Sequence, residues 1–197
     1  MNLNDKPQLK PSMAEAEAAV KTIIRYLGDN PDREGLLETP TRVIKSYTEF
    51  FRGYSQDPVS ILKKTFEDIS NYDEMVLVKD IRIESNCEHH MLPIIGTAHI
   101  AYIPNGKIVG ISKLARVADA FAKRLQTQEL LTVQIANTIN DVLKPHGVAV
   151  VINASHQCMT NRGVNKNNSL TVTSKMIGRF KSCDNLRKEF YNKINLT

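Results

Sequence analysis

Two short segments of the sequence combine thiol and imidazole side chains. Cys87 and His90 stand in a C-x-x-H spacing, and Cys158 lies far along the chain from them. That spacing lets a thiolate and an imidazole from one tight turn reach a single zinc ion, with Cys158 as the third ligand. Structural zinc sites are usually closed by four protein ligands, whereas a site with three keeps its fourth position open for water. The sequence therefore predicts a catalytic zinc site.

Each of these segments also contains a histidine that the ligand count does not need. His89 lies in the first segment and His156 in the second. Histidine titrates near neutral pH, so both are predicted to be acid–base groups beside the metal. Two other interpretations stay open: one of them is a fourth ligand, or the whole set consists of ordinary buried thiols and loop histidines. His99 is predicted to be structural within a strand, and His146 to be exposed in a turn.

The composition limits the class of protein. The chain has 197 residues, 42% of them hydrophobic, with three cysteines and a net charge of +5. This length suits one domain, or one domain with an appendage. No apolar run approaches the ~20 residues that span a bilayer, and the first residues do not resemble a secretory signal. Three widely spaced cysteines do not form a disulfide framework, which indicates a reducing, cytoplasmic location with thiols free for metal. The basic charge suits nucleic acid, an anionic membrane surface or a polyanionic substrate such as a nucleoside triphosphate, or else only a solvated surface.

The first sixty residues are predicted to form a tail and a helical appendage. Residues 1–11 are polar, and Ser12 with Glu15 matches the capping-box pattern that begins a helix. Thr39, followed by proline, is expected to begin a second helix, and Gly53 stands where a C-terminal cap is expected.

Residues 61–197 are predicted to form the catalytic domain. The expected elements are strands over 75–83, 97–103 and 107–111, a helix capped by Ser112, a helix over 131–142, strands over 148–152 and 170–173, and a closing helix over 186–194. Asn105-Gly106 indicates a hairpin between the second and third of these strands. Consecutive blocks of strands and of helices predict an α+β fold with an antiparallel sheet. Both metal segments follow strand ends, where loops present functional residues on a rigid base.

Several ordered motifs extend the pattern beyond the metal segments. They are Pro31-Asp32-Arg33-Glu34-Gly35-Leu36-Leu37-Glu38-Thr39-Pro40-x-Arg42-Val43, Cys87-Glu88-His89-His90, Tyr102-Ile103-Pro104-Asn105-Gly106, Ser112-Lys113-Leu114-Ala115-Arg116, Arg124-Leu125-Gln126-x-Gln128-Glu129, His156-x-Cys158-Met159-x-x-Arg162-Gly163-Val164 and Thr173-Ser174-x-Met176-x-Gly178-x-Phe180. With these motifs in this order and with compatible spacing, residues 15–195 resemble the GTP cyclohydrolase I family. The sequence departs from the family pattern at Thr127 and Leu130, neither of which carries chemistry.

The resemblance implies a fold and an assembly. The family has the tunnelling fold, in which antiparallel sheets backed by helices pair across subunits to close a ring. Two pentameric rings stack into a homodecamer with active sites at subunit interfaces. These features come from the resemblance, because the residue patterns themselves predict only an α+β fold.

The resemblance also implies a reaction. Water attacks C8 of the guanine ring of GTP, the imidazole ring opens, C8 leaves as formate, and the ribose carbons rearrange to give 7,8-dihydroneopterin triphosphate. This is the first step of folate or pterin biosynthesis. Zinc suits the hydrolytic step, because coordination lowers the pKa of water from about 15.7 toward ~7.

By resemblance, each residue of the metal segments has a role. Cys87, His90 and Cys158 match the ligands of one zinc ion per subunit. His156 matches the group that donates a proton to guanine N7, and His89 assists proton transfers at the opening ring.

The remaining site residues match substrate contacts of the family. Glu129 accepts from guanine N1–H and the 2-amino group, and Gln128 adds an amide contact. Ser112 matches the hydroxyl placed at the ribose. The cationic residues suit the triphosphate because arginine and lysine bind phosphate oxygens; they are Lys113, Arg116, Arg162 and, from the N-terminal helix of a neighbouring subunit, Arg42.

Three alternatives remain at this stage. The first is a non-enzymatic zinc module that binds nucleic acid, which would need a fourth ligand such as Cys183 or His99. The second is another tunnelling-fold enzyme that acts on a pterin or a deazapurine. The third is a catalytically lapsed paralogue, which the intact set of ligands and histidines argues against. We expect GTP as substrate, a homo-oligomer, and neither nucleic acid nor membrane as a partner.

Overall fold

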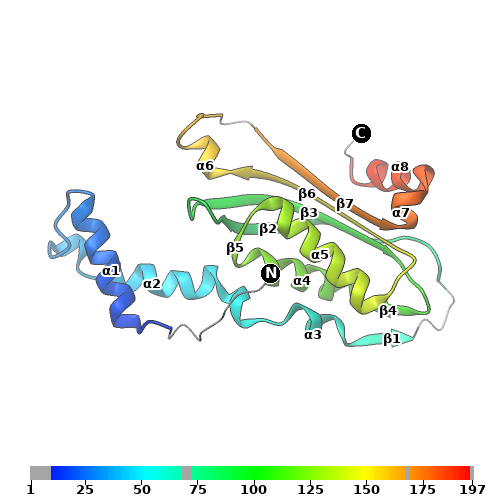
Figure 1. Ribbon diagram of the computed structural model, residues 1–197, viewed down its shortest axis with the longest axis horizontal. Coiled ribbons are helices and arrows are strands. Elements are labelled where there is room, and N and C mark those ends of the chain that lie inside the picture. The colour runs from blue at the N-terminus through cyan, green and yellow to red at the C-terminus, as the bar shows by residue number, and fades with distance from the viewer. Residues whose placement is uncertain (1–9, 68–71, 167–168, 196–197) are drawn as a thin grey trace, which may run out of the picture. The chain divides into compact units, whose positions relative to one another are not determined.

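The structure is a computed structural model that describes residues 10–67, 72–166 and 169–195 (Figure 1). The chain divides into two compact units, Met1–Glu49 and Phe50–Thr197. The boundary predicted at residue 60 therefore falls inside the second unit. Most of the predicted tail, residues 1–9, lies outside the described residues.

The first unit contains the two predicted helices. Helix α1 (Met13–Tyr26) begins with a complete capping box, in which Ser12 Oγ accepts from the Glu15 backbone and the Glu15 carboxylate accepts from the Ser12 backbone N–H over 2.8 Å. This reciprocal pair satisfies two N–H groups that have no partner within the helix. Helix α2 (Thr39–Phe50) begins at the predicted residue, after the short 3₁₀ helix η1 (Glu34–Leu36).

The second unit holds a five-stranded sheet with helices on both of its faces. Its elements are η2 (Arg52–Ser55), α3 (Pro58–Leu62), β1 (Thr65–Glu67), β2 (Val76–Cys87), β3 (Pro93–Ile103), β4 (Lys107–Val109), α4 (Ile111–Ala122), β5 (Leu125–Gln126), α5 (Gln128–Leu143), β6 (Gly147–His156), α6 (Gln157–Thr160), β7 (Thr171–Gly178), α7 (Arg179–Ser182) and α8 (Asp184–Lys193). The strand order is β5-β2-β3-β6-β7, and every pair is antiparallel except the two-residue pairing of β5 with β2. An α+β fold with an antiparallel sheet backed by helices is confirmed.

Strand β6 explains how the core is organised. Val148, Val150 and Ile152 face one hydrophobic cluster, which includes residues of α4 and α5, whereas Ala149 and Val151 face a second cluster with Phe180 of α7 and residues of α8. Successive side chains of a strand point to opposite faces. The uninterrupted apolar run in the sequence therefore belongs to a strand that is buried on both faces, and Figure 1 shows α5 and the α7–α8 pair beside it.

The predicted hairpin at Asn105-Gly106 is wrong. A turn forms there, with Gly106 at φ 69°, but β4 pairs with β1 in a separate two-stranded sheet. Strand β3 has no free edge for β4, because Tyr102 pairs with Val76 on one side and with Val148 on the other.

Two predicted helix caps are also wrong. Gly53 lies in η2, where its N–H donates to Lys123 O over 3.0 Å. A Cβ at this position would lie 2.3 Å from Ala120 O, so glycine is needed for a close approach between backbones and not for a cap. Helix α4 begins at Ile111 with Gly110 as its N-cap, which leaves Ser112 exposed in the first turn.

Candidate metal centre and active site

The first metal segment is a tight turn at the end of β2. The Cys87 N–H donates to Leu92 O, and the Met91 N–H donates to Cys87 O, each over 2.8 Å. Met91 has φ 54°, which reverses the chain so that β3 begins at Pro93. The turn holds Cys87 buried at its base, while His89 and His90 are exposed.

The sheet order brings the second metal segment to the same place. Strand β3 lies between β2 and β6, and Ile94 at its start pairs with His156 at the end of β6. The chain then enters α6, which carries Cys158 in a half-buried position against the main core cluster. Residues 87 and 158 therefore meet because they follow the ends of two strands on either side of β3.

The ligand atoms of Cys87, His90 and Cys158 all lie within 4.8 Å of one another. Cys87 Sγ lies 4.0 Å from His90 Nδ1. Burial, followed by the neighbouring Cys87 thiol, raises the pKa of the Cys158 thiol. A thiol whose ionisation is opposed in this way is stabilised as the thiolate by a divalent cation bound to it. The donor set of two sulfurs and one imidazole fits zinc and leaves a coordination position open.

The two additional histidines lie in different surroundings. His89 is exposed, with Nδ1 3.8 Å from Cys87 Sγ and Nε2 3.7 Å from a Glu88 carboxylate oxygen. His156 Nε2 lies 2.8 Å from Gln128 Oε1. Burial lowers the pKa of His156, and the nearby Glu129 carboxylate opposes that shift. A lowered pKa makes the imidazolium a better proton donor.

Gln128 and Glu129 form the start of α5. Thr127 caps the helix by accepting from the Leu130 N–H over 3.2 Å. Glu129 is exposed, whereas Gln128 is only 1% exposed. The Gln128 amide donates to Ile152 O over 3.0 Å and to Thr171 O over 2.8 Å. Of the two residues predicted to contact the base, only Glu129 presents its side chain to solvent.

Comparison with known proteins agrees with this geometry. Residues 16–195 match the family model described as GTP cyclohydrolase I. The chain belongs to the GTP cyclohydrolase I family.

Individual relatives support the family assignment. GTP cyclohydrolase 1 of Brucella abortus (strain S19) is 59% identical over 172 residues, which cover 87% of this chain and 81% of that protein. GTP cyclohydrolase 1 of Brucella canis is 58% identical over the same shares of the two chains. Membership of a family of enzymes confirms the prediction that the chain is an enzyme. A solved structure titled as the archaeosine synthase QueF-Like in the apo form superposes with a TM-score of 0.44 and 19% identity, over 53% of this chain and 93% of that one, which is too distant to inform the site.

Three residues of the GTP cyclohydrolase I motifs lie on the first turns of α4. Ser112 and Arg116 are exposed and Lys113 is half-buried. Arg116 lines a cavity of about 440 Å³ together with Asp57 and Asp119. Among the described residues, no hydrogen bond or ion pair joins these three motif residues to the metal ligands. Within one chain, the structure brings the metal ligands and the neighbouring histidine His89 together.

The other two predicted phosphate ligands lie in different units. Arg162 is exposed after α6, close enough to lower the pKa of Cys158 against the larger effect of burial. Arg42 belongs to the first unit, where it forms an ion pair with Glu38 four residues earlier. Arg162 is therefore the arginine that the second unit itself places beside the metal group.

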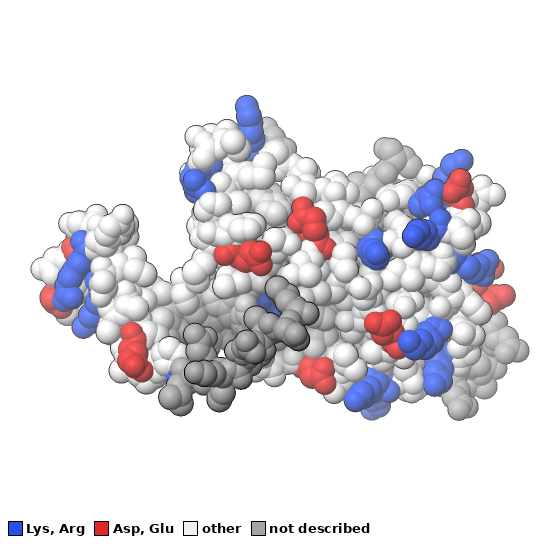
Figure 2. Space-filling view, in the orientation of Figure 1, with Lys and Arg blue, Asp and Glu red and all other residues white. Residues whose placement is uncertain are grey.

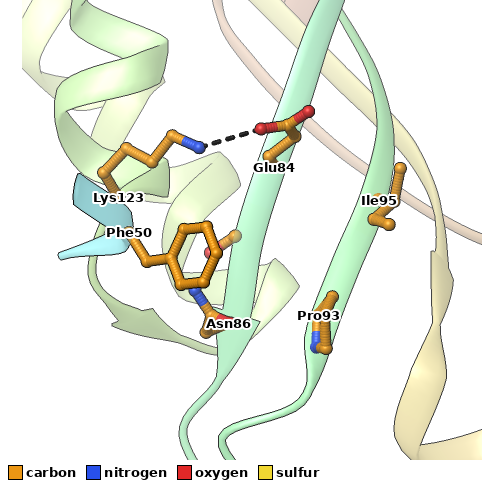
Figure 3. A pocket seen from close by; sticks show the side chains of 7 residues that line it. Phe50, Glu84, Asn86, Pro93, Ile95 and Lys123 are labelled. Carbon is orange, nitrogen blue, oxygen red and sulfur yellow. Dashed lines mark hydrogen bonds and ion pairs between the residues drawn. The ribbon is translucent and has the colours of Figure 1, made fainter. Parts of the chain in front are cut away.

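A second cavity lies beside the sheet end that carries the metal segment. Its volume is about 220 Å³, and Figure 3 shows Phe50, Asn86 and Pro93 at one end and the Lys123–Glu84 ion pair at the other. Ser85 Oγ is buried without a hydrogen-bond partner in the described part of the chain. None of the predicted site residues lines this cavity.

The residues that hold Gln128 were not predicted from the sequence. Thr173 Oγ1 accepts from the Gln128 amide over 3.1 Å and lies 2.7 Å from Thr132 Oγ1. No sequence pattern reveals these contacts, because α5 and β7 are far apart in the chain.

The described helices and the charged surface add two observations. No helix in the described ranges is both long and apolar enough to cross a membrane. On the face shown in Figure 2, the lysines and arginines lie in separate small groups with acidic side chains between them, rather than in one continuous basic surface.

Proposed function

We propose that this protein is a zinc-dependent GTP cyclohydrolase I that converts GTP and water to 7,8-dihydroneopterin triphosphate and formate. The family match supports the activity, and the convergence of the Cys87, His90 and Cys158 ligand atoms within 4.8 Å is the structural observation that carries the proposal. The relatives named GTP cyclohydrolase 1 point to the same substrate. The pathway that the product enters is folate or pterin biosynthesis.

The proposed metal is one zinc ion per subunit, held by Cys87, His90 and Cys158. When bound there, zinc supplies the activation of water near neutral pH that hydrolysis at C8 of guanine requires. A second thiolate reduces the Lewis acidity of the ion, so protein groups must assist with protons. The half-buried position of Cys158 and the burial of Cys87 favour retention of the ion.

The two additional histidines supply the proton transfers in this proposal. His156 donates a proton to N7 of guanine, which makes C8 more electrophilic. Its lowered pKa favours release of that proton. His89, exposed on the turn between β2 and β3, exchanges protons with the opening ring and with solvent.

Substrate recognition is assigned to the exposed polar residues around this centre. The Glu129 carboxylate, at the start of α5, accepts from N1–H and the 2-amino group of guanine. Ser112 is assigned to the ribose. The triphosphate is assigned to Lys113, Arg116 and Arg162, with Arg42 from another subunit.

The assembly proposed is a homodecamer of two pentameric rings with active sites between subunits, in the cytoplasm. The α4 residues suit an active site shared between subunits, because Ser112 and Arg116 are exposed and no hydrogen bond or ion pair among the described residues joins them to the metal ligands of their own chain. Free cysteines at the proposed metal site suit a reducing compartment.

The test is to incubate purified protein with GTP and to follow pterin absorbance and formate release, with and without a chelator. The proposal requires both products, their loss on chelation and their return with zinc. Bound metal without turnover of GTP would favour a lapsed or retargeted tunnelling-fold enzyme. A zinc module that only binds nucleic acid would release neither product.

A further inference from the structure

The side chain of Gln128 is fully engaged inside the protein. It is 1% exposed, and its Nε2 atom lies within hydrogen-bond distance of Ile152 O, Thr171 O and Thr173 Oγ1. Its Oε1 atom lies 2.8 Å from His156 Nε2. The amide thus links α5 to both β6 and β7.

These neighbours fix which way the amide is turned. The carbonyl oxygens of Ile152 and Thr171 accept hydrogen bonds and cannot donate, so the NH₂ group of Gln128 must face them. The oxygen of the amide therefore faces His156. The hydroxyls agree with this orientation, because Thr132 donates to Gln128 O over 2.7 Å and Thr173 in turn donates to Thr132 Oγ1.

The orientation of the amide decides the protonation of the imidazole. An amide oxygen only accepts, so His156 Nε2 must carry a proton and donate it to Gln128 Oε1. The other tautomer would place two lone pairs 2.8 Å apart in a half-buried position, which is unfavourable because the two lone pairs repel and form no hydrogen bond with each other. Nδ1 then remains as the ring nitrogen that is free of this bond and can exchange a proton with a substrate.

We propose that Gln128 is a positioning residue that holds His156 in its Nε2–H tautomer, so that Nδ1 exchanges the proton with the guanine ring. This inference rests on the proposed function for its substrate, and it replaces the predicted side-chain contact between Gln128 and the base. In the step, the imidazolium gives its Nδ1 proton to guanine N7 and becomes the neutral Nε2–H tautomer. Its Nε2–H bond to Gln128 is the same before and after the transfer, so the amide need not reorient.

The decisive variant is Gln128→Met, which keeps the length and volume of the side chain but removes every hydrogen bond of the amide. Gln134→Met is the matched control, because Gln134 lies on the same helix and accepts from Gln126 over 2.9 Å, away from His156. With the holoenzyme and GTP, we expect kcat of Gln128→Met to fall about 10- to 100-fold with KM within about twofold of wild type. The metal content should stay unchanged. Gln134→Met should keep kcat within about twofold.

Two kinetic outcomes would overturn the proposal. A rise in KM for Gln128→Met with kcat unchanged would mean that the amide contacts the base. Such a change shows the loss of an interaction that the bound substrate and the transition state share equally. An equal loss of kcat in both methionine variants would mean that Gln128 acts only through the stability of α5.

A second measurement remains decisive even where Gln128→Met does not fold. The nitrogen spectrum of wild-type protein labelled with ¹⁵N-histidine, with the His156 signal assigned by its loss in His156→Gln, reports which ring nitrogen carries the proton. We expect the neutral ring to be protonated at Nε2, and a neutral ring protonated at Nδ1 would overturn the proposal. If wild-type protein does not turn over GTP, the proposed function fails, and this spectrum still decides whether Gln128 sets the tautomer.

Discussion

Lys123 Nζ donates to Glu84 Oε2 over 3.0 Å, and the two side chains differ sharply in exposure: 8% for the lysine and 43% for the glutamate. The lysine charge is therefore largely removed from water, and the Glu84 carboxylate supplies the opposite charge that stabilises it. Lys123 lies just after α4 and Glu84 lies on β2, so the pair ties the end of the helix to strand β2 beside the cavity in Figure 3. The Lys123 ammonium lowers the pKa of Glu84, mainly through this hydrogen bond and then through its positive charge.

Glu84→Gln should destabilise the protein by about 1–3 kcal/mol, because it leaves the lysine charge buried with only a neutral partner. The midpoint of urea denaturation measures this. Glu189→Gln is the control: Glu189 pairs with Lys193 over 3.1 Å, but both side chains are about half exposed, so a loss below about 0.5 kcal/mol is expected. Equal effects in the two variants would show that burial of Lys123 does not matter.

Because the folded pKa of Glu84 is lowered, the contribution of Glu84 to stability is complete above pH 4.5 and is lost as the pH falls through the folded pKa.

Gly53→Ala should destabilise the second unit by about 2–3 kcal/mol. The new Cβ would lie 2.3 Å from Ala120 O and 2.7 Å from Lys123 O, and both are backbone atoms that cannot move independently. Thermal denaturation compared with Gly110→Ala tests this, because a Cβ at Gly110 meets nothing closer than 3.9 Å. The control should lose less than about 1 kcal/mol, the cost of alanine at an N-cap. A Gly53→Ala variant as stable as wild type would contradict the close packing of η2 on the end of α4.

His99 should make stability depend on pH. Its ring is 5% exposed, and Nδ1 accepts from the Asp80 N–H over 3.2 Å. Burial lowers its pKa, with Asp80 opposing this effect and Lys79 adding to it. An unfolded histidine titrates near 6.5. The stabilisation is therefore complete above pH 6.5, where both states are neutral, and is lost as the pH falls from 6.5 toward the lower folded pKa.

His99→Asn isolates this contribution, because the asparagine oxygen replaces the Nδ1 acceptor without titrating. Urea midpoints measured from pH 8 to pH 5 should fall less for His99→Asn than for wild type. His146→Asn, at an exposed ring, should keep the wild-type slope. If the urea midpoints of wild type and His99→Asn fell equally with pH, His99 would be ruled out as the source of the pH dependence.

Cys158→Ser should abolish tight metal binding and, with it, activity. The alcohol of serine does not ionise near neutral pH, so only Cys87 and His90 remain as ligands from the group in which all three lie within 4.8 Å. Zinc content after dialysis, measured by elemental analysis, should fall by at least about tenfold. Cys183→Ser is the control, since that half-buried thiol lies outside the group. Wild-type zinc content in Cys158→Ser would exclude Cys158 as a ligand.

The metal segments illustrate how much the sequence predicted. The C-x-x-H spacing of Cys87 and His90 is local, so a single turn places both residues whatever the rest of the fold. The prediction that Cys158 joins them depended on residue type, and the structure supports it through the order of β2, β3 and β6. Local signals predicted equally well the capping box of α1 and the buried strand β6.

Contacts between distant segments were beyond the reach of sequence patterns. Asn105-Gly106 correctly marks a turn, but whether β4 pairs with β3 depends on which edges of β3 are already occupied. Gly53 resembles a helix cap in the sequence, and only the approach of the backbone at Lys123 shows its role. Both cases depend on contacts with segments that are distant in the chain.

The sequence by itself determined which side chains could serve as metal ligands or acid–base groups, and it determined the α+β class, because residue type and short-range spacing set ligand chemistry and the periodicity of apolar residues distinguishes strands from helices. Only the tertiary structure decided that the Gln128 side chain faces His156 instead of solvent. Burial and hydrogen-bond satisfaction are properties of the packed α5, β6 and β7, and the orientation of an amide follows from the acceptors that surround it.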